Sequence, residues 1–275
     1  MSAARTLSIR DALYEAPGPR TRRRVRIGTA VSAVVVLLAI AAVVRQFWVT
    51  GQLAPRYWSL FLQWTTWRFL GQGLLGTVAV ALTAGAIALV LGLLLMLGRT
   101  SGVRPLAALC RVVTDFFRGV PSLLLIYFFF FVPAQLGLKL PSFWMLTLPV
   151  ALAASGVLAE VFRAGVNAVP RGQVEAALSI GLSKGKTMRK IVLPQAVRYV
   201  IPSLIAQLVV VVKDTTVAYV VSYPDLMQNA RVLITSYDAL VSLYLVIAVI
   251  YILINYAINK ASVAVANRTG VKIVR

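Results

Sequence analysis

Long apolar stretches separated by short polar segments dominate the hydrophobic pattern of the chain. A helix needs about 20 mostly apolar residues to cross the hydrocarbon layer of a membrane, and six stretches approach that length. They are Ile27–Val44, Gly73–Leu97, Val120–Leu136, Phe143–Val161, Tyr199–Val221 and Ala239–Asn259. The pattern therefore predicts an all-α integral membrane protein with six transmembrane helices.

The composition supports a membrane location and excludes several classes of enzyme. Hydrophobic residues make up 60% of the 275 residues and charged residues 13%, whereas a soluble domain has roughly 45–50% and 25%. The sequence contains no histidine, which excludes Ser-His-Asp and Cys-His catalysis and most zinc sites. We expect no catalytic residue, no metal site and no cofactor bound by this chain.

The net charge of +20 is explained by the side of the membrane on which the cations lie. With the N-terminus in the cytoplasm, the cytoplasmic segments hold 22 Lys and Arg and the outer loops hold 5. This bias predicts that both termini are cytoplasmic, and the charge does not indicate nucleic-acid binding. Tryptophan favours the membrane boundary, and five tryptophans fall near the outer one: Trp48, Trp58, Trp64, Trp67 and Trp144.

The first apolar stretch has an alternative interpretation as a cleaved signal peptide. It follows a basic segment and contains the triplet Ala39-Ile40-Ala41. Its 18 apolar residues, however, exceed the length of a usual signal sequence. We expect a retained helix that anchors and orients the protein, followed by an interfacial helix over Pro55–Phe69.

A polar segment, residues 163–197, carries most of the specific information, and we call it the elbow. Its apolar spacing predicts a first short helix over Gln173–Ile180. Gly181 is placed to end that helix in a left-handed conformation, Ser183 to cap a second helix, and Pro194 to close it. The expected product is a helix-turn-helix rimmed with cations, which suits docking on a soluble partner.

The sequence GLSKGKT at residues 181–187 is similar to a phosphate-binding loop. That loop has four residues between its two glycines and follows a strand, whereas here there are three and the context is helical. We expect no nucleotide to bind here, so any ATP is bound by another chain.

Lys213 and Asp214 are ionisable residues inside a predicted span. A charged group there costs free energy unless it is paired with an opposite charge or hydrated. They are candidates for a substrate pathway, and a structural ion pair with other helices is the alternative. Adjacent helical residues diverge by about 100°, so the two are poor partners for each other. Thr215 either adds a hydroxyl to the pathway or bonds back to its own helix.

Glu160 and Arg118 lie near the cytoplasmic ends of predicted spans. Glu160 precedes Arg163 by three residues, and an ion pair along the helix is the simpler interpretation. A role in a gate or a substrate cavity is the alternative for Glu160. Arg118 is expected to anchor the membrane boundary, or else to contact an anionic substrate.

The elbow resembles the EAA signature of permease subunits in bacterial ABC importers. Glu175-Ala176-Ala177, Gly181, Ile191 and Leu193-Pro194 follow that signature without a gap. In the family this loop docks into a cleft of the ATP-binding subunit. The resemblance thus implies docking roles for Gly172, Gln173, Glu175, Ala176, Ala177, Gly181, Ile191, Leu193 and Pro194.

Flanking motifs narrow the resemblance, over about Phe69 to Ala264, to permeases for polar amino acids. Val120 stands where Thr is usual, and Thr216-Val217 where Ser-Leu is common. The opening at Leu13–Arg20 looks like the longer permease subunit of glutamate uptake systems in Gram-positive bacteria. The motifs quoted are Glu160–Gly165, Arg171-Gly172-Gln173, Leu193–Ala196, Lys213-Asp214-Thr215 and Phe117–Pro121.

The resemblance implies ATP-driven import by alternating access, with glutamate or another acidic amino acid as the leading substrate. The partners implied are two ATP-binding subunits that hold ATP and Mg²⁺, a second permease subunit and an extracellular amino-acid-binding protein, in a bacterial cell membrane. A permease for glutamine, arginine or histidine is the first alternative. An ion-driven secondary transporter and a membrane scaffold are the others.

These inferences give an expected order of segments along the chain. The common core of the family has five helices, to which this chain adds a tail and one helix. The expected order is a basic cytoplasmic tail (1–26), an extra transmembrane helix (27–49), an outer interfacial segment (50–68), the permease domain (69–264) and a basic cytoplasmic tail (265–275).

Overall fold

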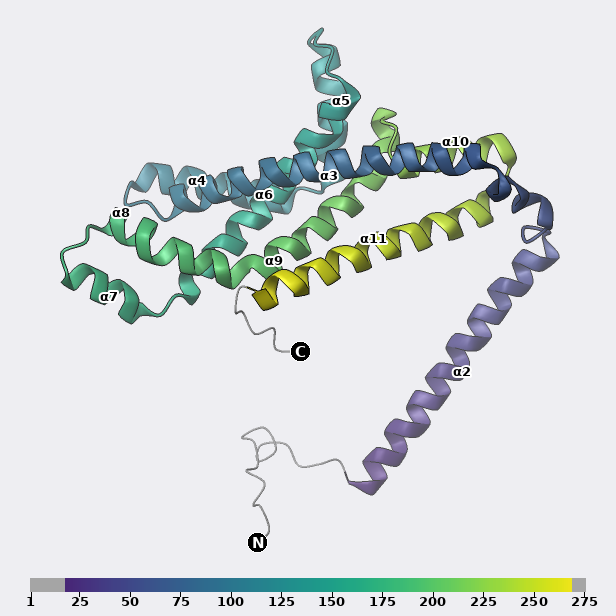
Figure 1. Cartoon of the computed structure of the whole chain (residues 1–275), viewed down its shortest axis with the longest axis horizontal. Helices are drawn as coiled ribbons and strands as arrows, with labels where there is room; N and C mark the ends of the chain where they lie inside the picture. Colours follow the sequence, from purple (N-terminus) through teal and green to yellow (C-terminus); the bar gives the residue numbers. More distant parts are fainter. Residues whose placement is uncertain (1–17, 269–275) are drawn as a thin grey trace. The chain divides into compact units, whose positions relative to one another are not determined.

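A computed structural model describes residues 18–268, and within that range the chain is helical and contains no β-strand (Figure 1). The predicted all-α architecture is confirmed. The predictions made for residues 1–17 and 269–275, including most of the opening resemblance, lie outside the described residues. The elements are α2 (Pro19–Val49), η1 (Pro55–Tyr57), η2 (Ser59–Leu62), α3 (Trp64–Arg99), α4 (Arg104–Gly119), α5 (Ser122–Gln135), α6 (Ser142–Ala168), α7 (Arg171–Ser179), α8 (Lys184–Thr187), η3 (Met188–Val192), α9 (Leu193–Asp214), η4 (Thr215–Val221), α10 (Leu226–Tyr237) and α11 (Leu240–Arg268).

The chain divides into two units, residues 1–55 and 56–275, which are described separately. In the first unit, α2 contains the predicted span Ile27–Val44 and extends beyond it at both ends. None of the 31 residues that the structure describes in α2 is buried. A helix that is apolar on all sides is typical of a membrane span whose surface is covered by lipid.

Helices α3 and α6 form the centre of the second unit. Helix α6 packs against α3, α4, α5 and α9. Small buried side chains on both central helices, such as Ala84, Ala88, Ala151 and Ala154, let the backbones approach closely. Close packing of small residues is a main source of helix association in membranes. The core of the unit therefore lies between these helices, and the outer faces of the bundle remain apolar and exposed.

A close approach between α3 and the turn before α10 depends on Gly76. A Cβ atom at this position would lie 2.4 Å from the carbonyl oxygen of Pro224. We expect Gly76→Ala to lower the free energy of unfolding by about 1–3 kcal/mol, since overpacking displaces the backbone. Thermal unfolding in detergent measures the change. The control is Gly71→Ala, whose new methyl group meets no atom within 4 Å. Equal unfolding midpoints for the two variants would contradict the argument.

The structure corrects the third predicted span, Val120–Leu136. Helix α5 has 14 residues, about 21 Å, which is shorter than the hydrocarbon layer of about 30 Å. It follows α4 across a break at which the axis bends by 99°. The break occurs because a residue before proline avoids the helical conformation, and Val120, before Pro121, is extended. The two helices form a broken span or a re-entrant loop.

The hydrophobic pattern misses α4 and α10 because both are short and amphipathic. Helix α4 carries Arg104, Arg111 and Arg118 among its apolar residues, and Thr114 is its one fully buried side chain within the described range. Helix α10 begins at a capping aspartate, Asp225, and holds only 12 residues. Neither helix contains an apolar run long enough to be recognised as a span.

The remaining spans are confirmed, and most are longer than predicted. Within residues 18–268, five helices are long and apolar enough to cross a membrane, or six if the bent pair counts as one span. The predicted interfacial helix Pro55–Phe69 is wrong in part: two short 3-10 helices fill its first half, and α3 begins at Trp64. The spans correspond to α2, α3, α6, α9 with η4, and α11.

Candidate functional site

The elbow forms the helix-turn-helix that its sequence predicts. Helix α7 covers nearly all of the predicted first helix and ends before Gly181, which has a φ of +82°. Glycine reaches this left-handed conformation without steric cost. The Ser183 hydroxyl then accepts a hydrogen bond from the backbone N–H of Lys186 and caps α8. The turn chemistry of these two residues therefore sets the geometry of the elbow.

The predicted end of the second helix at Pro194 is wrong. Helix α8 continues through a five-residue π-helix, η3, directly into α9. Proline in a helix lacks an N–H and collides with the carbonyl group four residues earlier, and the wider π turn before Pro194 relieves this conflict. The Gln195 side chain also donates a hydrogen bond of 2.9 Å to the carbonyl of Ile191. The second helix of the elbow, from Lys184 onward, is therefore the first part of the long apolar helix that includes α9.

The inner face of the elbow packs on the ends of α6 and α9 through a small apolar cluster. Val169, Val192 and Ala196 are buried there, and Val174 and Met188 pack against them. Ala177 is also buried, with 4% of its surface exposed. This packing fixes α7 against the helices that follow and precede it.

The outer face of the elbow is exposed and chemically mixed. Ile180 is 78% exposed and Leu178 42%. Glu175 is the only acid among residues 163–197. Of the signature residues, Gly172, Gln173, Glu175, Ala176, Gly181 and Pro194 are exposed, Ile191 and Leu193 are half-buried, and Ala177 is buried.

A cleft of about 540 Å³ lies between the elbow and the C-terminal end of α3. Apolar side chains of the elbow and hydroxyl groups from the turn after α3 face each other across it. Its wall includes Leu97, Thr100, Ser101, Val166, Val174, Leu178, Lys184, Thr187, Met188 and Val192.

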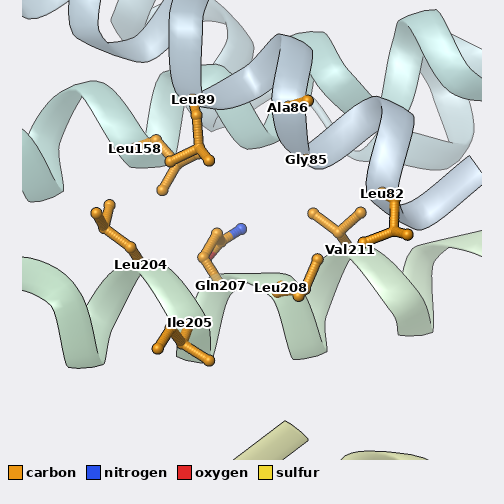
Figure 2. A pocket seen from close by; sticks show the side chains of 10 residues that line it. All are labelled: Leu82, Gly85, Ala86, Leu89, Leu158, Leu204, Ile205, Gln207, Leu208 and Val211. Atoms are coloured by element: carbon orange, nitrogen blue, oxygen red, sulfur yellow. The ribbon is translucent and has the colours of Figure 1, made fainter. Parts of the chain in front are cut away.

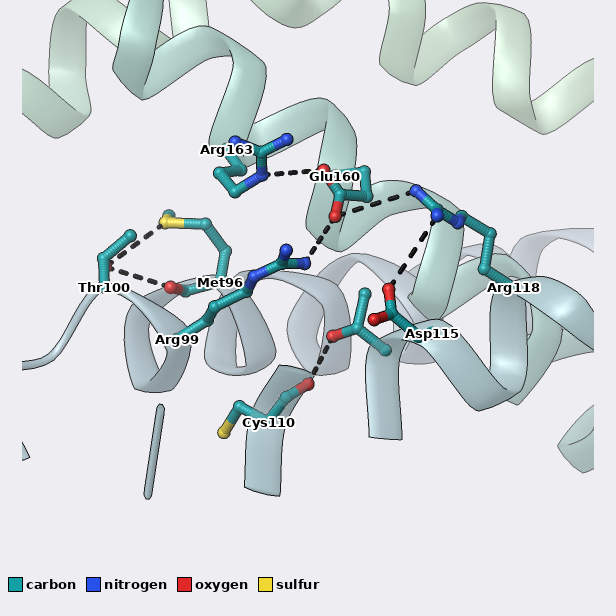
Figure 3. A network of polar contacts seen from close by, with 9 residues as sticks. Met96, Arg99, Thr100, Cys110, Asp115, Arg118, Glu160 and Arg163 are labelled. Atoms are coloured by element: carbon teal, nitrogen blue, oxygen red, sulfur yellow. Dashed lines mark hydrogen bonds and ion pairs between the residues drawn. The ribbon is translucent and has the colours of Figure 1, made fainter. Parts of the chain in front are cut away.

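Glu160 lies at the centre of a cluster of arginines that joins α3, α4 and α6 (Figure 3). It accepts a hydrogen bond of 2.7 Å from Nε of Arg163, which confirms the predicted ion pair. It also pairs with Arg99, and Arg118 lies 3.7 Å away. Arg118 lies 3.8 Å from Asp115 as well. The two predicted candidates Glu160 and Arg118 thus belong to one network.

The sequence does not identify Arg99 as a partner of Glu160. The two residues are 61 positions apart, and only the packing of α3 on α6 brings them together. The available signal is that Arg99 is a lone cation directly after a long apolar stretch. Side-chain exposures of 19% for Arg99 and 16% for Glu160 make this pair the most enclosed contact of the network.

Lys213, Asp214 and Thr215 lie where α9 passes into η4, and no described hydrogen bond or ion pair connects them to the Glu160 network. Lys213 is exposed and Asp214 half-buried, with Ser122 nearby. Thr215 is fully buried, and its hydroxyl donates a 2.8 Å hydrogen bond to the carbonyl of Val212. This bond satisfies the hydroxyl within its own helix.

An apolar pocket of about 360 Å³ lies between α3 and α9 (Figure 2). Gln207 is its only polar lining side chain. The carboxamide group of Gln207 is directed toward α3 in the close-up. The predicted pathway residues do not line it. Half of the ten lining residues are leucines: Leu82, Leu89, Leu158, Leu204 and Leu208.

Asp225 is a buried acid that the sequence analysis does not single out. One carboxylate oxygen accepts a 2.7 Å hydrogen bond from the backbone N–H of Gln228 and caps α10. The other oxygen is buried without a hydrogen-bond partner among the described residues. Burial raises the pKa of Asp225 from 3.8 to about 6. The capping position is the local signal that identifies it.

We expect Asp225→Asn to change how stability depends on pH. The folded protein holds the Asp225 proton more tightly than the unfolded chain, so its contribution to stability is lost as the pH rises from about 4 to about 6. The loss amounts to about 2–3 kcal/mol, at 1.4 kcal/mol for each pKa unit. Asparagine still caps the helix, so the variant is more stable than the parent at pH 7 and similar at pH 4. The free energy of unfolding of parent and variant, measured from pH 4 to pH 7, tests this prediction. Parallel curves of stability against pH for the two proteins would refute it.

Comparison with known proteins places the chain among transport proteins. Residues 88–270 match the family described as the binding-protein-dependent transport system inner membrane component. The glutamate transport system permease protein GluD of Corynebacterium glutamicum is 33% identical over 213 residues, which cover 76% of this chain and 78% of that protein. The probable glutamine ABC transporter permease protein GlnP of Bacillus subtilis is 33% identical, covering 70% of this chain and 90% of that protein.

A solved structure agrees with these relatives. The crystal structure of an amino acid ABC transporter with histidines is similar to this chain with a TM-score of 0.70 and 27% sequence identity, over 73% of this chain and 94% of that one. Together with the apolar helices described above, the matches identify a multi-pass membrane protein. The chain belongs to the family of inner membrane permease components of binding-protein-dependent ABC importers.

Proposed function

We propose that this chain is the permease subunit of an ATP-driven importer of polar amino acids, with glutamate and other acidic amino acids as its first substrates. The observation that carries the proposal is the elbow, which exposes Glu175 on α7 and Ile180 directly after it, beside a second helix that runs on from α8 through η3 into α9. The family match and the relatives named for glutamate and glutamine transport support it.

In this proposal the exposed face of α7 docks on a separate ATP-binding subunit in the cytoplasm. ATP and Mg²⁺ are held there and not by this chain. ATP binding moves the docked α7, and the continuous helix that follows passes the motion to the spans. A ligand shifts such an equilibrium only by binding one state more tightly. ATP and the loaded binding protein must therefore both favour a conformation that the free permease disfavours.

The proposed assembly contains two ATP-binding subunits, a second permease subunit and an extracellular amino-acid-binding protein. The proposed order of segments keeps a cytoplasmic N-terminal tail (1–26), an extra span (27–49), an outer segment (50–68) and a permease domain (69–264), with a cytoplasmic C-terminal tail (265–275). Both termini are cytoplasmic in this arrangement, as the distribution of cations favours.

For the substrate pathway, Lys213, Asp214 and Thr215 remain the proposed contacts, because they lie together where α9 becomes irregular. The back-bonding of the Thr215 hydroxyl leaves Lys213 and Asp214 as the stronger candidates. Arg118 and Glu160 are assigned to the arginine cluster, where each already has charged partners. Lys213 supplies the cation that an acidic substrate requires.

Uptake into proteoliposomes tests the proposal. The vesicles contain this chain, its co-purifying subunits and its binding protein, with ATP sealed inside. We expect ATP-dependent uptake of labelled glutamate, inhibited best by unlabelled glutamate and aspartate and less by glutamine and arginine. ATP-dependent uptake of another amino acid would exclude glutamate as the substrate but would support the function as a permease. Flux that follows an imposed ion gradient without ATP would overturn the proposal.

Deletion of residues 1–49 tests the role of the extra span. We expect the shortened protein to reach the membrane in a smaller amount, because its first anchoring and orienting segment is gone. Quantifying protein in isolated membranes, together with uptake per molecule, separates insertion from transport. Unchanged values for both would remove the anchoring role.

A further inference from the structure

Five arginines crowd the first two turns of α2, and we call them the arginine collar: Arg20, Arg22, Arg23, Arg24 and Arg26. All five side chains are exposed. Helix α2 contains no Asp or Glu, and in the described part of the chain no acidic side chain forms an ion pair with the collar. Among residues 18–268 the collar is therefore a dense patch of positive charge that is paired with no acidic side chain.

The collar spreads over more than half of the circumference of the helix. At about 100° per residue, Arg20 and Arg24 lie near one side, Arg22 and Arg26 lie roughly opposite, and Arg23 lies between them. A protein that docks on a helix contacts mainly one stripe of it, as in helix packing. Lipid headgroups surround a membrane helix on all sides, so the spread of the collar fits lipids better than a docked protein.

When the apolar stretch of α2 spans the hydrocarbon layer, the collar falls at the depth of the lipid phosphates. The apolar stretch of α2 begins at Ile27, directly after Arg26. At 1.5 Å per residue the five arginines fall within about 10 Å of that boundary. The headgroup layer on each side of the hydrocarbon is roughly 5–8 Å thick. The opposite end of the helix carries a single cation, Arg45, so the charge is confined to one layer.

We propose that the arginine collar binds the phosphates of anionic phospholipids and keeps such lipids around α2. Guanidinium groups match phosphate oxygens with two parallel hydrogen bonds. Clustered cations next to a span are attracted to an anionic membrane surface. This interaction is independent of amino-acid transport and gives the first unit of the chain a lipid-binding role.

Lipid retention in detergent tests the collar without depending on membrane orientation. The full chain is incubated in mixed micelles with equal amounts of phosphatidylglycerol and phosphatidylcholine, then separated by gel filtration. Lipid per protein chain is measured by mass spectrometry. The triple variant Arg22→Gln, Arg23→Gln, Arg24→Gln should retain at least threefold less phosphatidylglycerol and the same amount of phosphatidylcholine.

A matched control removes three exposed arginines from another part of the chain: Arg171→Gln, Arg189→Gln and Arg198→Gln. This control should retain as much phosphatidylglycerol as the parent. Equal losses in the two triple variants, or no preference of the parent for phosphatidylglycerol, would overturn the proposal. Displacement of the lipid by millimolar inorganic phosphate would also overturn it, because the site would then bind a free anion.

Discussion

Glu175→Lys should reduce ATP-driven uptake by at least tenfold while the amount of protein in the membrane stays the same. Glu175 is exposed on α7, and the elbow also carries five exposed cations: Arg171, Lys184, Lys186, Arg189 and Lys190. No described side-chain hydrogen bond or ion pair within the chain involves its carboxylate, so the substitution does not disturb the fold. Reversing the charge at a docking surface costs several kcal/mol of binding, on the order of 2–5.

The measurement pairs uptake with ATP hydrolysis in the assembled transporter. Loss of docking predicts that substrate and binding protein no longer stimulate ATP turnover. Asn167→Lys is the control for the new cation, because it also introduces a lysine at an exposed position, on α6 outside α7, but removes no negative charge. It should leave uptake unchanged. Normal uptake together with normally stimulated ATP turnover in Glu175→Lys would contradict the assignment of α7 as the docking helix.

Glu160→Gln should lower the free energy of unfolding by about 2–3 kcal/mol. Removing one partner of a buried ion pair costs about 3–5 kcal/mol, and the partial exposure of this network reduces that cost. Without the carboxylate, Arg99 and Arg163 face each other with no acid between them. The repulsion acts where α3 meets α6, so the helices at the centre of the bundle separate more easily.

Thermal unfolding in detergent, at low and at high salt, measures the effect. Asp115→Asn removes a carboxylate from the same network, but Asp115 is 51% exposed and lies 3.8 Å from Arg118. A contact of that kind contributes roughly 0–1 kcal/mol, so this control should change stability little. If the Glu160→Gln protein is as stable as its parent, Glu160 is not the centre of the network.

The sequence predicts those parts of the molecule that depend on local chemistry. Long apolar stretches identify the spans, because a helix that faces lipid needs little else. Gly181 and Ser183 identify the turn of the elbow, because each acts on backbone groups within a few residues of itself. The first helix of the elbow, its turn and the start of its second helix could therefore be placed nearly to the residue.

Features that depend on packing between distant segments could not be predicted. The contact of Arg99 with Glu160 requires α3 to lie against α6, and the burial of Asp225 requires α10 to lie against α3. The failure at Pro194 has a different cause. Proline usually ends a helix, but a π turn before it accommodates the ring, and no residue pattern near it reveals that turn.

The unbroken run from α8 through η3 to α9 has a mechanical consequence. From Lys184 to Asp214 this rod is about 45 Å long. Rotating one end by about 5° displaces the other by about 4 Å, by the geometry of a lever of that length. A displacement of this size is comparable to the rise of a helical turn, 5.4 Å. The five-residue π segment lies between the turn of the elbow and Lys213, so its stiffness then determines how much of the rotation reaches Lys213.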